Sequence, residues 1–179
     1  MIYLIIEDVS IATEQIILDS LSNITCNKLM VDIYDVRYEH DQLGKPVVYI
    51  NNAEILKCSI AHKDIIKVMA LSNSEIGIDI ESKQIKSHLT YLFHRNEQQL
   101  LAINSSLNLT KLWTLKEAAS KSLGFGLNYG INSIYISNIK EDTIYFNNSV
   151  TDILYVAQYL SVQILEYTIS LIYNVQRSQ

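Results

Sequence analysis

Two acidic side chains in the segment Gly77-Ile78-Asp79-Ile80-Glu81 are the clearest candidates for chemistry. The segment is typical of a strand, in which alternate side chains share a face. Asp79 and Glu81 then point one way, while Ile78 and Ile80 point into a core. Neighbouring carboxylates repel each other unless a cation lies between them, and Mg²⁺ prefers such oxygen ligands. The pattern indicates either a divalent-metal site or a half-buried strand whose polar face meets water.

A second polar group lies between Trp113 and Gly124, in a segment with a helical pattern. Trp113, Glu117 and Lys121 follow one another at intervals of four residues and therefore share one stripe of the helix. Lys116 lies about 100° round the helix from Glu117. An amphipathic helix with an exposed Glu–Lys pair explains these charges, but the tryptophan on the same stripe favours a pair that faces a pocket.

Further short motifs surround these two segments. In chain order they are Gly44-Lys45-Pro46, Ser59-Ile60-Ala61-His62, the pair Phe93 and Glu97, and the helix end Gly124-Phe125-Gly126-Leu127. With the GIDIE and WxxKEAxxKxxGxGL patterns, they resemble the 4'-phosphopantetheinyl transferases over roughly residues 44–127. Because Gly77 lies well inside the chain, the resemblance is to the longer, surfactin-synthetase-activating type of the superfamily.

The resemblance implies an enzyme of the holo-[acyl-carrier-protein] synthase type. Such an enzyme moves the 4'-phosphopantetheine arm of coenzyme A to a serine of an apo acyl or peptidyl carrier protein, and it releases adenosine 3',5'-bisphosphate. It further implies that Asp79, Glu81 and Glu117 hold Mg²⁺, with Mn²⁺ as the alternative metal. Glu117 would take the proton from the carrier serine, and Lys121 would neutralise the departing phosphate.

The resemblance also implies a set of residues that contact coenzyme A, namely Lys45, His62, Lys116 and Lys121. From the residues alone, His62 is read as an ordinary surface histidine, and Lys45 could be a solvated loop lysine. The chain departs from the family at Ser59 and Ala61, where the family has asparagine and serine, so one hydroxyl contact to phosphate is missing. The alternative function is a weak or inactive homologue that binds a carrier protein or coenzyme A. Another Mg²⁺-dependent phosphoryl-transfer enzyme is disfavoured by the GKP and GxGL motifs.

The elements that position these residues are predicted from hydrophobic periodicity. Strands are predicted at 2–6, 55–60, 65–71, 76–80, 131–137, 142–147, 151–160 and 162–175, and helices at 16–24, 84–93, 97–103 and 109–123. Residues 34–53 look irregular, and the short link 72–75 predicts a hairpin between its flanking strands. Asn96 and Asn108 are predicted N-caps, and Gly124 is predicted to follow a helix end.

An internal repeat indicates how these elements are organised. Residues 2–8 align without gaps on residues 76–82, with three identities in seven, and Asp79 corresponds to Ile5. Together with the resemblance, this predicts an α+β fold of two pseudo-symmetric halves, each a helix packed on a small antiparallel sheet. The predicted halves are 1–75, which is shortened, and 76–179, which carries the metal and catalytic residues. Because one chain then contains both halves of a pseudodimer, the protein is expected to be a monomer.

Composition excludes several classes of protein. A net charge of −5 is the wrong sign for binding a nucleic-acid backbone. No run of about 20 apolar residues could span a bilayer, and the start of the chain lacks the basic region of a secretory signal. Cys26 and Cys58 have no metal-ligand spacing. We therefore expect a cytoplasmic protein that binds neither nucleic acid nor membrane.

The remaining charges and apolar residues carry weaker expectations. Lys57, Lys63 and Lys67 form a basic run, which is usually a solvated face, although Lys63 adjoins His62 and could reach a nucleotide phosphate. The histidines at 40, 88 and 94 are predicted to be structural or surface residues. Because carrier proteins are typically acidic, an acidic enzyme must recognise them through a local apolar patch. The residues proposed for that patch are Phe93, Leu123, Phe125 and Leu127.

Overall fold

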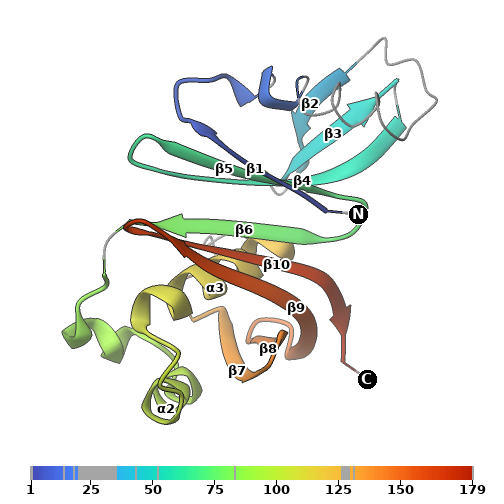
Figure 1. Cartoon of the computed structure of the whole chain (residues 1–179). Coiled ribbons are helices and arrows are strands. Elements are labelled where there is room, and N and C mark those ends of the chain that lie inside the picture. Colours follow the sequence, from blue (N-terminus) through green and yellow to red (C-terminus); the bar gives the residue numbers. More distant parts are fainter. Residues whose placement is uncertain are drawn as a thin grey trace.

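The structure is a computed structural model, and it describes residues 2–13, 15–17, 19, 36–42, 44–51, 53–82, 84–125, 130 and 132–178. Two five-stranded antiparallel sheets lie face to face (Figure 1). The first contains, in spatial order, β1 (Ile2–Asp8), β5 (Ile66–Ser72), β4 (Ala53–Lys63), β3 (Pro46–Ile50) and β2 (Val36–His40). The second contains β6 (Ile76–Glu81), β10 (Tyr167–Arg177), β9 (Ile153–Ile164), β8 (Thr143–Asn148) and β7 (Ile134–Lys140).

The two sheets have the same strand order, since each begins with its first strand at one edge and then runs backwards from its fifth to its second. β1 and β6 are the equivalent edge strands, and they start at the two residues that the sequence repeat aligns, Ile2 and Ile76. The predicted α+β fold with two pseudo-symmetric halves is confirmed. The boundary between residues 75 and 76 remains a prediction.

A core of nine buried side chains joins the two sheets. It consists of Ala61, Val68 and Ala70 from the first sheet and Ile76, Ile78, Ile80, Tyr167, Ile169 and Leu171 from the second. Because side chains alternate along a strand, the isoleucines of β6 face the first sheet, and Gly77, Asp79 and Glu81 face the opposite way.

Helices cover the outer face of each sheet. The helix α3 (Leu109–Ser122) packs on β6 and β10, and it places Leu112, Leu115, Ala118 and Ala119 in a second buried core. In the first half, the helical residues Ile16 and Ile17 are buried against the first sheet. The remainder of the helix predicted at 16–24 lies outside the described residues, except for Asp19, which is helical. The order of layers is therefore helix, sheet, sheet, helix.

Shorter elements bring the chain from β6 to α3. After β6 come the 3-10 helix η1 (Ser87–Leu92) and the helix α2 (Arg95–Ile103), and α2 contacts β7. Asn108 caps α3 as predicted, with its side chain accepting a hydrogen bond from the Lys111 amide. Gly124 follows the helix end with a φ of 80°, a left-handed conformation that suits glycine. No helix in the described ranges is long and apolar enough to cross a membrane.

Three expectations about local structure are wrong. The link Ser72–Glu75 does not close a hairpin, because β5 pairs with β1 and β4 while β6 pairs with β10 in the other sheet. Residues 34–53 contain the paired strands β2 and β3 rather than only irregular structure. The N-cap of α2 is His94 instead of Asn96, because Glu97 accepts a hydrogen bond from the His94 amide and completes a capping box.

Candidate active site

The candidate site begins with an unusually close approach of β6 to α3 at Gly77. A Cβ atom built on Gly77 would lie 1.9 Å from the Ala118 carbonyl oxygen and 2.6 Å from the Ser122 amide nitrogen. Only glycine fits there without moving the helix or the strand. Because Asp79 follows two residues later on the same face of β6, this approach places its carboxylate against the side chains of α3.

Asp79 forms an ion pair with Lys121 of α3, with 2.7 Å between Oδ1 and Nζ. The aspartate is 6% exposed. Burial raises its pKa, and the attraction of the Lys121 ammonium opposes that rise. The two motifs that the sequence places 42 residues apart thus meet in space, as expected.

Glu117, one turn before Lys121 on α3, lies in the same electrostatic neighbourhood. Burial raises the pKa of Glu117 to about 7, and the nearby negative charges of Asp79 and Glu81 add to the rise, while Lys121 opposes it. A glutamate with a pKa near neutrality can exchange a proton at physiological pH, as a general base must. The three predicted metal ligands are thus coupled by charge.

Glu81 is held from the first half of the chain by Lys63, whose Nζ lies 2.8 Å from Glu81 Oε1. This ion pair raises the pKa of the Lys63 ammonium. Ala61 and Lys63 share one face of β4, the face that packs toward β6, whereas His62 lies on the other face and is exposed. The side chain beside the carboxylates is therefore Lys63, and His62 has no contact with them. Alternation along residues 58–63, counted from the apolar Cys58, could have assigned these faces from the sequence.

The motif residues that depart from the family have structural roles. Ser59, where the family has asparagine, is buried, and its hydroxyl accepts a hydrogen bond from the Ile78 amide at 3.0 Å. β6 is an edge strand, so this bond occupies one of its unpaired backbone groups. Ala61 is buried between the sheets and offers no polar group.

Lys45 joins the two halves at the end of α3. Its ammonium donates to the Glu75 carboxylate and, at 3.0 Å, to the Ser122 carbonyl oxygen. It also lines a groove of about 350 Å³ between the halves. The other lining residues are Asp41, Val47, Lys57, Glu75, Ser122, Leu123, Gly124, Phe125, Tyr155 and Arg177. Lys45 is thus at a candidate ligand site and is not a solvated loop lysine.

Lys116 does not belong to the nucleotide-binding set that the sequence predicted. Its side chain is 1% exposed and its ammonium lies 2.7 Å from Glu97 Oε2, in a pair whose other member is fully buried. The remaining oxygen of Glu97 accepts a hydrogen bond from the Ile136 amide at 3.0 Å. An ammonium enclosed in this way cannot reach a bound phosphate. Through Glu97, Lys116 instead links α3 to α2 and β7.

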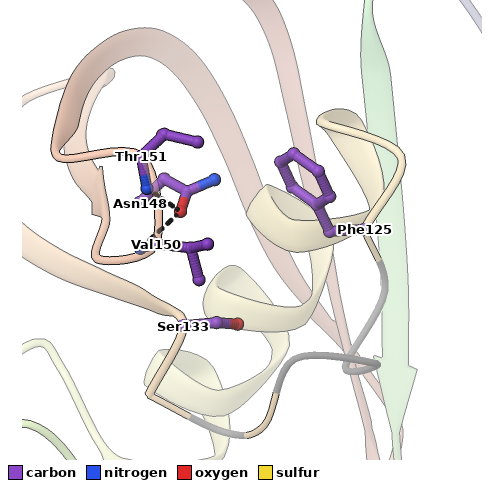
Figure 2. Close-up of a pocket in the computed structure, with 5 residues that line it drawn as sticks. All are labelled: Phe125, Ser133, Asn148, Val150 and Thr151. Carbon is purple, nitrogen blue, oxygen red and sulfur yellow. Dashed lines mark hydrogen bonds between the residues drawn. The ribbon is translucent and has the colours of Figure 1, made fainter.

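Of the four residues predicted to form an apolar patch for carrier recognition, Phe93 is not at the surface, whereas Leu123 and Phe125 are partly exposed. Phe93 is buried in the core beneath α3, where its ring meets Trp113 edge to face. Phe125 lines the groove between the halves and also a smaller cavity of about 150 Å³, shown in Figure 2. In that cavity it lies across from Val150, while the Asn148 side-chain oxygen accepts two backbone hydrogen bonds. Leu127 and Gly126 lie outside the described residues.

Whether these residues fit a metal ion follows from their chemistry. Among the described residues, no three histidine, cysteine or acidic side chains are arranged as a metal site. Two of the three carboxylates already form ion pairs with lysines, Asp79 with Lys121 and Glu81 with Lys63. Nevertheless the donors are hard oxygen ligands, and mutual repulsion contributes to the raised pKa of Glu117, so a divalent cation would relieve an existing excess of negative charge. The donor set therefore fits Mg²⁺ or Mn²⁺.

Comparison with known proteins identifies the family of the chain. A sequence model of the 4'-phosphopantetheinyl transferase superfamily matches residues 75–172, more than half of the chain, and the chain belongs to this superfamily. It is also 29% identical over 140 residues, 72% of its length, to the 4'-phosphopantetheinyl transferase gsp of Aneurinibacillus migulanus. The match covers 57% of that relative, so the chain spans little more than half the relative's length.

Proposed function

We propose that this chain transfers the 4'-phosphopantetheine arm of coenzyme A to a serine of an apo carrier protein, as a holo-[acyl-carrier-protein] synthase. The observation that carries the proposal is the meeting of Asp79 and Lys121 beside Glu117, whose pKa burial raises to about 7. This group offers carboxylates, a base suited to neutral pH and an ammonium. Transfer of a phosphoryl group to a hydroxyl needs these three kinds of group.

Asp79, Glu81 and Glu117 would hold Mg²⁺, which when bound supplies positive charge to the pyrophosphate of coenzyme A. Glu117 would accept the proton of the carrier serine hydroxyl as its oxygen forms a bond to phosphorus. The bond between that phosphorus and the bridging oxygen of the pyrophosphate breaks, and adenosine 3',5'-bisphosphate leaves. Lys121, already 2.7 Å from Asp79, would neutralise the charge that appears on the departing phosphate.

Lys63 is the group from the first half that would act in this site. Its ammonium lies 2.8 Å from Glu81 Oε1, so it is next to one of the three carboxylates. We assign to Lys63 part of the phosphate contact that the family resemblance gave to His62, because His62 points away from the carboxylates.

The test is intact-protein mass spectrometry of an apo carrier protein incubated with this chain, coenzyme A and Mg²⁺. A mass gain of one phosphopantetheine arm, abolished by EDTA and by replacing the carrier serine, supports transfer. We expect Asp79→Asn and Glu117→Gln to lower the rate by at least about a hundredfold. Glu141→Gln, at an exposed turn, is the matched control and should leave the rate unchanged.

Two negative results would have different meanings. If several carriers gain no mass although coenzyme A binds by calorimetry, the chain is the binding module named as the alternative function. If there is neither transfer nor binding, the proposal fails.

We also propose that the chain acts as a cytoplasmic monomer, and light scattering of the purified chain tests its oligomeric state.

A further inference from the structure

The two carboxylates of β6 each pair with a lysine, and the two lysines come from different elements. Lys121 reaches Asp79 from α3, with 2.7 Å between Nζ and Oδ1. Lys63 reaches Glu81 from β4 in the first sheet, with 2.8 Å between Nζ and Oε1. Lys63 lies just after the motif Ser59-Ile60-Ala61-His62 and before the residues that the superfamily model matches. Its contact with Glu81 is therefore visible only in the folded chain.

The net charge of the carboxylate group depends on Lys63. Asp79, Glu81 and Glu117 carry three negative charges when all are ionised, and the two lysine ammoniums offset two of them. A hydrogen bond to Glu81 raises the pKa of Lys63, and the charge of Asp79 adds to that rise, so Lys63 interacts with more than its direct partner. Without the Lys63 ammonium, one more negative charge would be unopposed, and an added divalent cation would be attracted more strongly.

The Lys63 ammonium can leave Glu81 without disturbing the packing of the site. The Lys63 side chain is 32% exposed and that of Glu81 is 19% exposed. Because a lysine has a flexible four-carbon stem, its charged end can turn into water while the stem stays on the strand. Glu81 Oε1 also accepts a hydrogen bond from the Ser82 amide at 2.9 Å, which still holds the carboxylate when the ammonium has left.

We propose that Lys63 competes with the divalent cation, because in the metal-free chain its ammonium pairs with Glu81 and so weakens cation binding. This inference rests on the proposed function, in which Asp79, Glu81 and Glu117 hold the cation. Cation binding then requires the ion pair between Lys63 and Glu81 to open. The displaced ammonium stays beside the carboxylates, where it is available for the phosphate contact proposed for it.

The test is a titration of the full chain with Mn²⁺ alone at physiological ionic strength, in which electron paramagnetic resonance measures the free ion. Lys63→Met removes the competing charge and should tighten Mn²⁺ binding by about fivefold, the factor expected when one partly exposed ion pair no longer has to open. Lys63→Arg keeps the charge, so its affinity for Mn²⁺ should stay within about twofold of the original.

Lys57→Met is the matched control. Lys57 lies on the same strand, its side chain is 33% exposed, and it lies 3.9 Å from Glu75, which is not one of the three carboxylates. Six residues separate it from Lys63, roughly 20 Å along a strand, and salt screens exposed charges at that distance. Both variants change the net charge of the chain equally, so only Lys63→Met should change the affinity for Mn²⁺.

Thermal unfolding gives a second measurement. In EDTA, Lys63→Met should have a lower Tm than the original chain, because nothing then offsets the charge of Glu81. Saturating Mn²⁺ should raise the Tm of Lys63→Met by more than that of the original chain, since the variant binds the ion more tightly.

The inference is overturned if Lys63→Met binds Mn²⁺ no more tightly than the original chain, or if Lys57→Met tightens binding by the same factor. Weaker binding by Lys63→Met would show that the lysine positions Glu81 for the cation instead of competing with it. If Asp79→Asn abolishes Mn²⁺ binding while Lys63→Met leaves it unchanged, only this inference fails. If the original chain binds no Mn²⁺, the metal site of the proposed function fails with it.

Discussion

The contact between β6 and α3 at Gly77 yields a prediction whose magnitude follows from the coordinates. A carbon and an oxygen in ordinary contact lie about 3.4 Å apart, whereas the Cβ of Gly77→Ala would lie 1.9 Å from the Ala118 oxygen. Strand and helix would have to separate by about 1.5 Å, because both clashing partners are backbone atoms that cannot rotate away. The substitution therefore affects the position of α3 as well as the stability of the fold.

Overpacking in a well-packed core typically costs about 1–3 kcal/mol, and a clash with backbone belongs at the upper end. For a chain of this size, about 3 kcal/mol lowers Tm by roughly 6–12 °C. Gly44→Ala is the matched control, because a Cβ atom on Gly44 would meet no other atom within 4 Å. The control has a cost of its own, since Gly44 has a φ of 79°. Its left-handed backbone should cost about 1–2 kcal/mol. Differential scanning calorimetry of the two variants measures the difference.

Transfer activity gives an independent measurement at a temperature where both variants are folded. Separating β6 from α3 lengthens the 2.7 Å contact between Asp79 and Lys121, so Gly77→Ala should lose activity and Gly44→Ala should keep most of it. The reasoning is refuted if Gly77→Ala has a Tm no lower than that of Gly44→Ala and transfers at the normal rate.

Two further predictions concern buried charges. Because burial raises the pKa of Glu117 from 4.5 to about 7, the folded chain binds a proton more tightly there than the unfolded chain, and stability is lost as pH rises between these values. In EDTA, Glu117→Gln should therefore raise Tm at about pH 8 and have little effect near pH 4.5; an equal shift at both pH values contradicts this. Lys116→Met should cost about 3–5 kcal/mol in chemical denaturation, since it leaves the Glu97 carboxylate buried without its cation. Lys140→Met, on an exposed side chain, should change stability by less than about 0.5 kcal/mol, and similar losses in the two variants would show that the buried pair is not important.

Local sequence patterns predicted the site where periodicity alone decides the geometry. The alternation in β6 directs Asp79 and Glu81 to one face, and the four-residue spacing on α3 places Glu117 and Lys121 together. Both geometries are set by residues within a single strand or helix, so they do not depend on how distant parts of the chain pack. The glycine that lets β6 and α3 meet was part of the same motif, although its role is visible only in the packing.

Features that depend on distant partners could not be predicted in the same way. Lys116 looks like a surface lysine from its helix, and only the buried carboxylate of Glu97, supplied by α2, makes its burial tolerable. The short link between β5 and β6 has the length of a hairpin turn. Nothing local to residues 72–75 indicates that β6 will pair with β10, a strand almost 100 residues further along the chain.

The identical strand order of the two sheets has a consequence for binding stoichiometry. In an arrangement with true twofold symmetry, every site between the halves would occur twice. Here the position equivalent to Asp79 is Ile5, which packs against the core of the first half, so the symmetry-related place has no carboxylate to offer. One half supplies Lys45 and Lys63 and the other supplies the acidic residues. The chain should therefore bind one coenzyme A molecule, and a titration should saturate at a single equivalent.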